Sequence, residues 1–190
     1  MMLVCTRGVM QEEASDEALM ERAQNGDRTA FAALYTRHRP ALTAFLTRFT
    51  GHAALAEDLA QESFLRLWEA RGRFDRRRKF KIWLYVAAKN LALNALKSRR
   101  EQPLGETDRA EAVQRPSVLV EAVAEALQSL PEPQRLALVL TVYEQFSHRE
   151  AAKAMGCTEV SARVLAFRAR QALKQRLAPL LERGYETESI

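Results

Sequence analysis

The sequence predicts an all-α protein made of two small helical domains joined by a flexible linker. Apolar residues recur at spacings of three and four along most of the chain, and no stretch alternates apolar and polar residues as a half-buried strand would. Residues that start and stop helices separate these apolar stripes at short intervals. One internal stretch, residues 101–117, is polar and acidic and lacks an apolar face, which is typical of a linker.

Composition excludes several classes of protein. The chain has 190 residues, of which 47% are hydrophobic and 28% charged, so it can form one ordinary domain or two small ones. No apolar run approaches the roughly 18 residues of a membrane span, and the start is too short for a signal peptide, so we expect a cytoplasmic protein. Two cysteines, Cys5 and Cys157, cannot form a disulfide framework and lack the partners of a zinc site. We expect no metal and no cofactor.

Helices are predicted in order over residues 15–100, after an N-terminal tail over residues 1–14. A short helix opens at Asp16, and Asn25-Gly26-Asp27 provides a turn and a cap for the next helix. Pro40 is predicted to begin a further helix, which Gly51 ends. A longer helix then runs until Gly72 stops it. The basic run 76–79 is a loop, and the last helix of this half extends from Phe80 to about residue 100.

The second half, residues 118–178, again shows helical periodicity. One helix runs from Val118 to Leu130-Pro131, and Pro133 suits the first turn of the next. Ser147 and Glu150 form a capping box for a short helix that Gly156 ends. A long helix follows from about residue 160, and residues 179–190 are read as a C-terminal tail.

The last two helices have the spacing of a helix-turn-helix. A small residue, Ala152, stands four positions before the turn glycine Gly156, where two helices must approach closely. In the second helix a buried stripe is predicted at Ala162, Ala166, Ala169 and Leu173, with Ser161, Arg163, Arg168 and Arg170 largely off it. This pattern favours DNA reading over the alternative, a helical hairpin that only packs.

Positive charge is concentrated in one block. The chain carries a net charge of +5, yet residues 64–100 alone hold 12 basic and 2 acidic residues. Such a block suits phosphate neutralisation, and the alternative is a solvated basic face. On the helix from Phe80, five residues at helical spacing share one face, and four apolar residues share another. The first face consists of Trp83, Val86, Asn90, Asn94 and Lys97, and the second of Leu84, Ala88, Leu91 and Ala95.

Aromatic rings lie beside this basic block. Unstacked bases can sit on the rings of Phe74, Phe80, Trp83 and Tyr85. An aromatic residue at helical spacing is more often part of a core, so we expect about two of these four to be buried. The combination of rings, amides and charge predicts contact with single-stranded nucleic acid.

Two motif blocks resemble a known family. The runs DLAQESFLRLW (58–68) and FKIWLYVAAKNLALN (80–94) resemble the bacterial sigma factors of the extracytoplasmic-function (ECF) type, within the sigma-70 family of RNA polymerase sigma factors. LPEPQR (130–135) and the following helix-turn-helix resemble that family's second conserved domain. The resemblance covers residues 15–100 and 118–178. It implies a helical bundle of sigma region 2 and a helix-turn-helix of sigma region 4.

The resemblance also implies partners and roles. Binding to the clamp helices of the largest subunit of core RNA polymerase is implied for Asp58, Gln61, Glu62, Phe64 and Leu65. Melting and reading of the promoter's minus-10 element is implied for Phe74, Arg78, Lys79, Trp83, Asn90, Asn94 and Lys97. Reading of the minus-35 element is implied for Ser147, Thr158, Ser161, Arg163 and Arg168. An anti-sigma factor that binds between the two domains is implied as a further partner.

The chain departs from the family pattern at two places. Asn94 stands where the family commonly has Asp, and Val164-Leu165 stands where it often has Ser-Arg. The predicted function is therefore a non-catalytic promoter-specificity subunit of RNA polymerase. The alternative is a stand-alone helix-turn-helix regulator whose N-terminal helices only dimerise it. An enzyme is not expected, because His38, His52 and His148 lie in unrelated segments and no glycine loop could cradle a phosphate.

Overall fold

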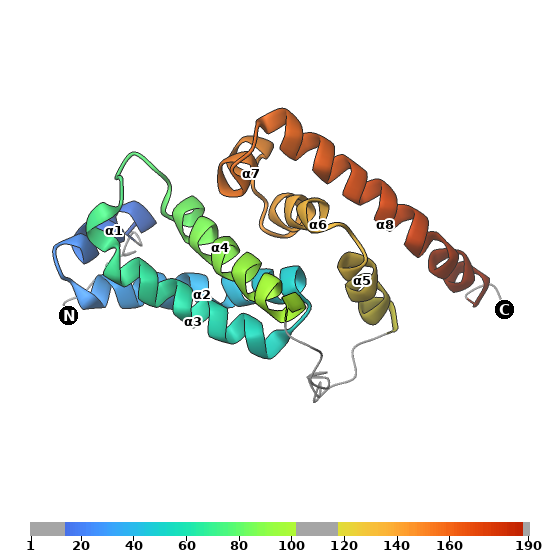
Figure 1. Ribbon diagram of the computed structural model, residues 1–190, viewed down its shortest axis with the longest axis horizontal. Helices are drawn as coiled ribbons and strands as arrows, with labels where there is room; N and C mark the ends of the chain where they lie inside the picture. Colours follow the sequence, from blue (N-terminus) through green and yellow to red (C-terminus); the bar gives the residue numbers. More distant parts are fainter. Residues whose placement is uncertain (1–13, 102–117, 188–190) are drawn as a thin grey trace, which may run out of the picture.

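The computed structural model describes residues 14–101 and 118–187, and throughout these ranges the regular structure is helical, without strands (Figure 1). The all-α prediction is confirmed. The elements in order are α1 (Asp16–Gln24), α2 (Arg28–Thr50), α3 (Ala53–Glu69), the 3₁₀ turn η1 (Arg71–Arg73), α4 (Phe80–Glu101), α5 (Val118–Gln128), α6 (Glu132–Leu138), the π-helical turn η2 (Val139–Tyr143), α7 (His148–Met155) and α8 (Glu159–Thr187). The predicted linker, except residue 101, lies outside the described residues, as does most of the N-terminal tail. In the described part of the chain, no helix is long and apolar enough to cross a membrane.

Helices α1 to α4 form a bundle, and Ser15, Asp27 and Gly51 begin or end helices as predicted. Gly72 does not end a helix, contrary to the prediction, because α3 already ends at Glu69 and Gly72 lies within the 3₁₀ turn η1. The Ser15 hydroxyl accepts a hydrogen bond from the Ala18 N–H at 3.2 Å, and the Asp27 side chain caps α2 by accepting from Ala30 N–H at 3.0 Å. Gly51 ends α2 with a φ of 81°. The left-handed conformation suits glycine because it has no Cβ.

Pro40 does not begin a helix, contrary to the prediction. It lies inside α2, which continues unbroken to Thr50. A proline within a helix removes one backbone hydrogen bond and costs about 3 kcal/mol. The apolar stripe on both sides of it is buried, including Leu34, Leu42 and Phe45, each of which is 0% exposed. Burying each such side chain contributes about 1.5–3 kcal/mol, so core packing outweighs the local cost.

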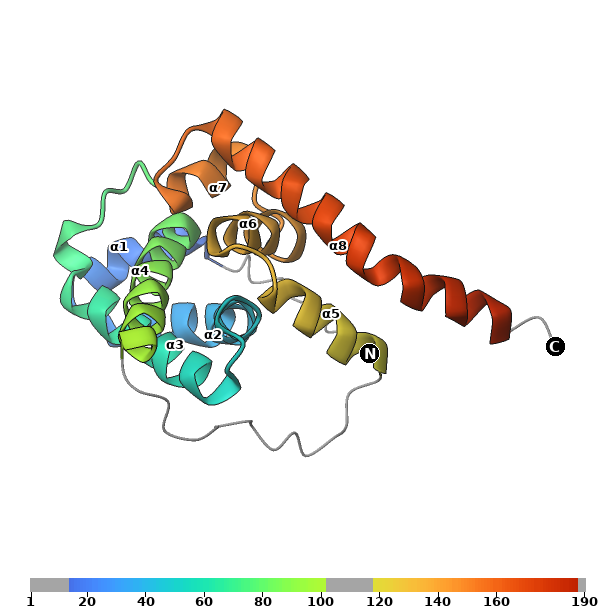
Figure 2. The same cartoon turned by 45° about the vertical axis from the view of Figure 1, so that its right-hand side comes forward.

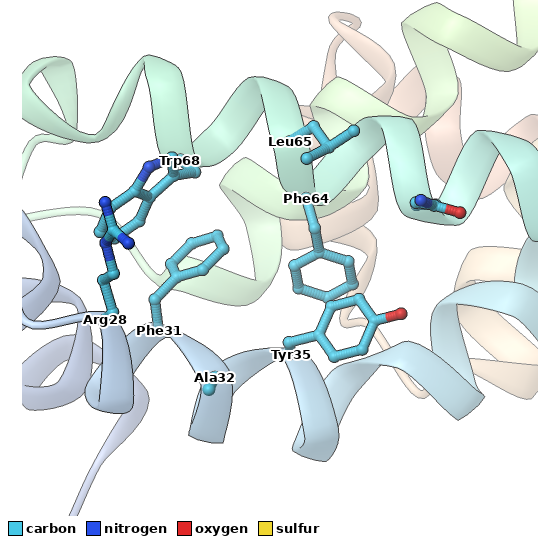
Figure 3. A pocket seen from close by; sticks show the side chains of 8 residues that line it. Arg28, Phe31, Ala32, Tyr35, Phe64, Leu65 and Trp68 are labelled. Atoms are coloured by element: carbon cyan, nitrogen blue, oxygen red, sulfur yellow. The ribbon is translucent and has the colours of Figure 1, made fainter.

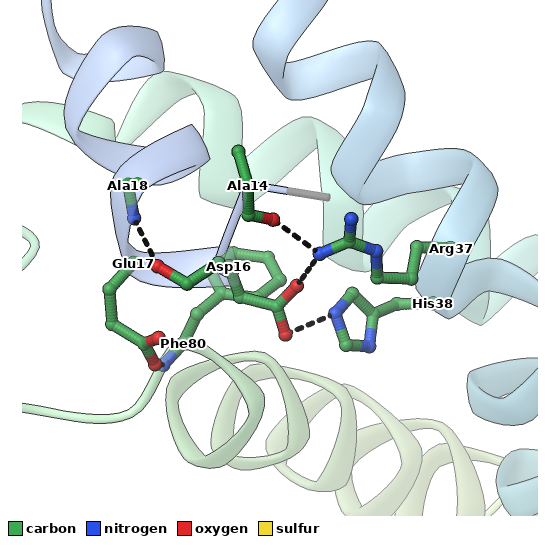
Figure 4. A network of polar contacts seen from close by, with 8 residues as sticks. Ala14, Asp16, Glu17, Ala18, Arg37, His38 and Phe80 are labelled. Carbon is green, nitrogen blue, oxygen red and sulfur yellow. Dashed lines mark hydrogen bonds and ion pairs between the residues drawn. The ribbon is translucent and has the colours of Figure 1, made fainter. Parts of the chain in front are cut away.

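A polar network ties α1 to α2 and α4 (Figure 4). The Asp16 carboxylate binds the Arg37 guanidinium at 2.6 Å and Nε2 of His38 at 2.7 Å. One residue further on, Glu17 Oε1 accepts the Phe80 N–H at 3.1 Å and thereby caps the first turn of α4. The His38 ring also lies 5.3 Å from the Phe80 ring. This network fixes where α4 starts, immediately after the basic loop.

Helices α5 to α8 form a second bundle. Pro133 lies in the first turn of α6, as predicted, but the π-helical turn η2 that follows was not expected. The capping box between Ser147 and Glu150 is present, and Gly156 ends α7 with a φ of 76°. Helix α8 extends to Thr187, beyond the boundary at residue 178 predicted for this domain.

The two bundles pack against each other, which the sequence did not indicate (Figure 2). Buried side chains from α6 to α7 join the hydrophobic core of the first bundle; these are Leu136, Val139, Leu140, Phe146, Ala151 and Ala154. Polar contacts cross the same boundary. Lys79 Nζ lies 2.6 Å from Glu150, Lys81 Nζ donates to the Glu144 carbonyl at 2.8 Å, and Gln128 Nε2 donates to the Arg48 carbonyl at 2.9 Å. The two predicted units therefore form one continuous packed body in this conformation.

Candidate nucleic-acid interface

The loop between η1 and α4 presents four consecutive cations, Arg76 to Lys79, the first of which pairs with Glu21. Asp75 organises the loop, because its side chain accepts the Arg77 N–H at 3.0 Å and its carbonyl accepts the Arg78 N–H at 2.9 Å. Arg77, Arg78 and Lys79 are all exposed. The predicted position of this basic run, in a loop immediately before α4, is confirmed.

The exposed face of α4 continues this basic surface. Asn90, Asn94 and Lys97 are exposed, while Trp83 and Val86 are half-buried, so the five residues lie on one side of the helix as predicted. The two amides can donate and accept hydrogen bonds at base edges, and Lys97 supplies charge. Lys97 Nζ lies 3.9 Å from Glu101 Oε1 and keeps 77% of its side chain exposed.

Three of the four aromatic residues named for base stacking are buried, where about two were expected. Phe74, Phe80 and Tyr85 are 5%, 0% and 1% exposed. Phe74 is therefore not an exposed base platform in this conformation. Its ring lies 5.1 Å from the Trp83 ring and supports it from below the surface. Trp83 is the half-buried ring of the set, and its orientation depends on this buried cluster.

A cleft of about 750 Å³ separates the basic loop and the start of α4 from α7. Its lining contains five cations and one carboxylate; the charged residues are Arg77, Arg78, Lys79, Arg149, Lys153 and Glu150. The hydrogen bond from Lys79, together with bonds from Ser147, lowers the pKa of Glu150 to about 2. The cleft is thus electropositive, and its one carboxylate remains ionised at neutral pH.

The helix-turn-helix has the predicted geometry. Ala152 is 4% exposed and packs at the turn, where its carbonyl accepts the Gly156 N–H at 2.8 Å. The Thr158 hydroxyl accepts the Ser161 N–H at 3.1 Å and so caps α8. The Ser147 hydroxyl likewise belongs to the capping box. Both side chains therefore hold the motif together, and their contact with DNA stays a prediction.

The cations and the buried stripe of α8 lie on different sides of the helix. Ala162, Ala166 and Ala169 are each 0% exposed, which confirms this part of the predicted stripe. Arg163 is exposed and pairs with Glu159 at 3.2 Å, and Arg168 is also exposed. Their contact with DNA phosphates stays a prediction.

A second candidate surface lies between α2 and α3 (Figure 3). It is an apolar groove of about 490 Å³, lined by Arg28, Phe31, Ala32, Tyr35, Gln61, Phe64, Leu65 and Trp68. Gln61 and Leu65 are exposed at this groove, and Leu65 keeps 52% of its surface accessible despite being apolar. Phe64 is 2% exposed, so it forms the floor of the groove and not an exposed contact.

The α2 side of this groove was missed from the sequence. The Phe31 ring lies 5.1 Å from Trp68, and the Tyr35 ring lies 4.9 Å from Phe64. Helical periodicity predicts only an apolar stripe at these positions, because it does not tell a groove wall from a core. The remaining predicted residues, Asp58 and Glu62, lie on α3; Asp58 is exposed, and Glu62 pairs with Arg66 at 2.7 Å.

Nothing in the described ranges groups three or more potential metal ligands. His38 contacts Asp16, and His52 stands at the N-cap of α3. His148 opens α7. The described histidines are thus spread over separate parts of the fold, without a shared nucleophile.

Family models match both halves of the chain. The model of Sigma-70 region 2 matches residues 34–102, which include the α3 side of the groove and the α4 surface. The model of Sigma-70, region 4 matches residues 120–173, which include the helix-turn-helix.

Relatives and solved structures agree with these matches. The RNA polymerase sigma-H factor of Pseudomonas aeruginosa is 32% identical over 190 residues, covering 90% of this chain and 98% of the relative. The ECF RNA polymerase sigma-E factor of Escherichia coli K12 is 30% identical, covering 92% and 100%. The structure of CnrH in complex with the cytosolic domain of CnrY superposes with a TM-score of 0.72 at 26% identity, covering 87% of this chain and 99% of that one. RpoE of Bartonella quintana, in complex with the anti-sigma factor NepR, gives 0.69 at 27% identity, covering 78% and 96%.

Proposed function

We propose how the surfaces described above divide the work of transcription initiation in this chain, which belongs to the ECF sigma factors of the sigma-70 family. As a sigma factor, the chain is not an enzyme; it binds core RNA polymerase and directs initiation at promoters through their minus-10 and minus-35 elements. The observation that carries this function is the match of both sigma regions, in the family's order, on one chain.

The first bundle, residues 15–100, takes polymerase binding and minus-10 recognition. The groove between α2 and α3 receives the clamp helices: Leu65 supplies the exposed apolar contact, Gln61 and Asp58 supply polar contacts, and Phe64 shapes the floor. An exposed leucine beside a ring-lined groove favours a helical partner.

The minus-10 element binds along α4 and the basic loop. Trp83 provides the stacking surface, and Asn90 and Asn94 read base edges. Lys97 and the loop cations Arg78 and Lys79 neutralise phosphates. Each captured base contributes about 1–3 kcal/mol, so binding energy alone drives strand opening.

The second bundle, residues 118–178, reads the minus-35 element through α8. Arg163 and Arg168 contact the backbone or base edges, and Ser161 and Thr158 lie at the entering end of the helix. When the two bundles come apart, the connection between them lets each reach its own promoter element on the same DNA.

The packed conformation supports regulation by an anti-sigma factor. CnrH and RpoE, two similar proteins, are seen with CnrY and with the anti-sigma factor NepR. In this chain Glu150 of α7 forms an ion pair with Lys79, a predicted minus-10 contact. An anti-sigma factor that stabilises this packing would keep the promoter-binding surface closed. The chain acts in the cytoplasm, where polymerase and chromosome are found.

The test is co-elution of the purified chain with bacterial core RNA polymerase, followed by transcription from fragmented genomic DNA. Stable co-elution with new, discrete start sites is the expected result. Leu65→Glu should abolish co-elution, whereas Leu119→Glu, at a leucine on α5 with a similar exposure of 51%, should not. Failure to bind core polymerase, combined with specific duplex binding by the chain alone, would favour the stand-alone regulator.

A further inference from the structure

The outward face of α8 carries an apolar strip near the start of the helix. Val160, Val164 and Phe167 recur at steps of four and three and are 67%, 41% and 58% exposed. Exposed apolar side chains clustered on one helix face are costly in water unless they meet a partner. The polar contacts assigned to this helix above do not use these three residues.

The packing of α8 determines which way this face points. Three alanines, Ala162, Ala166 and Ala169, are fully buried, and Ala169 packs with Leu127, Leu130 and Leu138 of the second bundle. At about 100° per residue, Val164 and Phe167 then project from the opposite side of the helix. In a helix-turn-helix this is the side of the second helix that enters the major groove.

The surrounding charge identifies the partner as DNA. On one side of the apolar strip lies Arg163, with 63% of its side chain exposed, and on the other lies Arg168, which is also exposed. A protein partner would need carboxylates at both edges to match this pattern. The two phosphate backbones that border a major groove supply the matching negative charge on both sides.

We propose that Val164 and Phe167, with Val160 at the entering end, read thymines in the minus-35 element through the C5-methyl groups. The major groove offers an apolar side chain one apolar feature that identifies a base, the methyl group of thymine. The Val164 side chain has no hydrogen-bonding group, so an apolar contact is the one it can make with a base. This inference rests on the proposed role of α8 in minus-35 recognition.

The test replaces thymidine by 2′-deoxyuridine, which removes the methyl group of the base and keeps every hydrogen-bonding group. The minus-35 element is first selected from random duplexes by the complex of the full chain with core polymerase. Duplexes carrying one substitution at a time are then titrated with that complex. Each contacted methyl should contribute about fourfold in affinity, equivalent to about 0.8 kcal/mol per buried methyl or methylene group.

Variants connect each methyl group to a side chain. In Val164→Ala, the penalty for uracil at one thymine should disappear, and in Phe167→Ala the penalty at a neighbouring thymine should disappear. Val118→Ala is the matched control, because Val118 is 77% exposed at the start of α5 and should leave every penalty unchanged. All three side chains are exposed, so circular dichroism and thermal melting should match the wild-type chain.

Two results separate this inference from the proposed function. Equal affinity for thymine and uracil at every position, with minus-35 dependence intact, would overturn the inference and leave the proposed function standing. If replacement of the whole element had no effect on affinity, minus-35 recognition itself would be refuted. A selected element without thymine under α8 would also overturn the inference.

Discussion

Tyr85→Phe should release the two bundles from each other. The Tyr85 hydroxyl donates a hydrogen bond to the Glu144 carboxylate across the boundary between α4 and the segment after η2. Burial, reinforced by the adjacent Glu144 charge, raises the pKa of Tyr85 far above its ordinary value, so the phenol stays protonated. Glu144 is 6% exposed, and Arg48 lies 3.9 Å from it. The carboxylate therefore depends on Tyr85 for a close donor from the first bundle.

The size of the expected change in the ratio of packed to separated molecules follows from the burial of this carboxylate. A hydrogen bond to a charged group contributes about 1.5–3 kcal/mol. When the bundles separate, water solvates Glu144, so the lost bond weakens the packed conformation selectively. The ratio of packed to separated molecules should then fall about ten- to hundredfold. The ring itself stays, because its contacts with Phe45 at 4.9 Å and Phe146 at 5.1 Å do not involve the hydroxyl.

Energy transfer between dyes on the two bundles measures this ratio. Cysteines at Ala53 on α3 and Lys174 on α8, in a chain whose own cysteines are replaced by serine, carry the dyes. Tyr85→Phe should move molecules to low transfer efficiency. Tyr143→Phe, which removes a hydroxyl from a ring that is 37% exposed, should not. An unchanged efficiency distribution in Tyr85→Phe would refute the role assigned to the buried carboxylate.

Three further predictions concern stability and binding. Gly51→Ala should lower the free energy of unfolding by about 1–2 kcal/mol because of its left-handed backbone, and by more because the new Cβ would lie 2.8 Å from Gln128 Cδ. Urea denaturation measures this, and Gly72→Ala, whose Cβ meets open space, is the control. Because the pKa of Glu150 is lowered from 4.5 to about 2, the contribution of its ionised carboxylate to stability is fully present above about pH 5 and is lost as the pH falls toward 2. The difference in unfolding free energy between wild type and Glu150→Gln should therefore shrink over that range, and a constant difference would contradict the ion pair with Lys79. Lys97→Ala and Arg163→Ala should each weaken promoter binding and reduce the slope of log affinity against log salt by about 0.7–0.9, and unchanged slopes in both would count against their phosphate contacts.

Local signals predicted most element boundaries. Ser15, Asp27, Gly51 and Gly156 cap helices as their residue types indicate, because capping depends on side chains and backbone angles within a few residues. The helix start predicted at Pro40 was wrong because distant contacts, not local ones, decided the outcome. Its local preference was outweighed by the burial of the stripe on both sides of it, which involves residues distant in the sequence.

Site residues divide in the same way. The exposure of Asn90 and Asn94 was predicted correctly, because the helical period separates them from the apolar face, while their contact with DNA stays a prediction. Phe64 and Phe74 were named as contacts but lie in the core. Aromatic residues at helical spacing serve packing and binding alike, and only their neighbours in space decide which.

The sequence by itself determined the helical class, the caps, the basic loop, the helix-turn-helix and the family. These depend on periodicity, local capping and motif order, all of which are properties of neighbouring residues. Only the tertiary structure decided that the bundles share a core, that Glu144 and Glu150 meet Tyr85 and Lys79, and that α8 turns its valines and Phe167 outward. Those features arise from contacts between residues about 60 or more positions apart, or from the rotation of a helix against its neighbours, which no local pattern specifies.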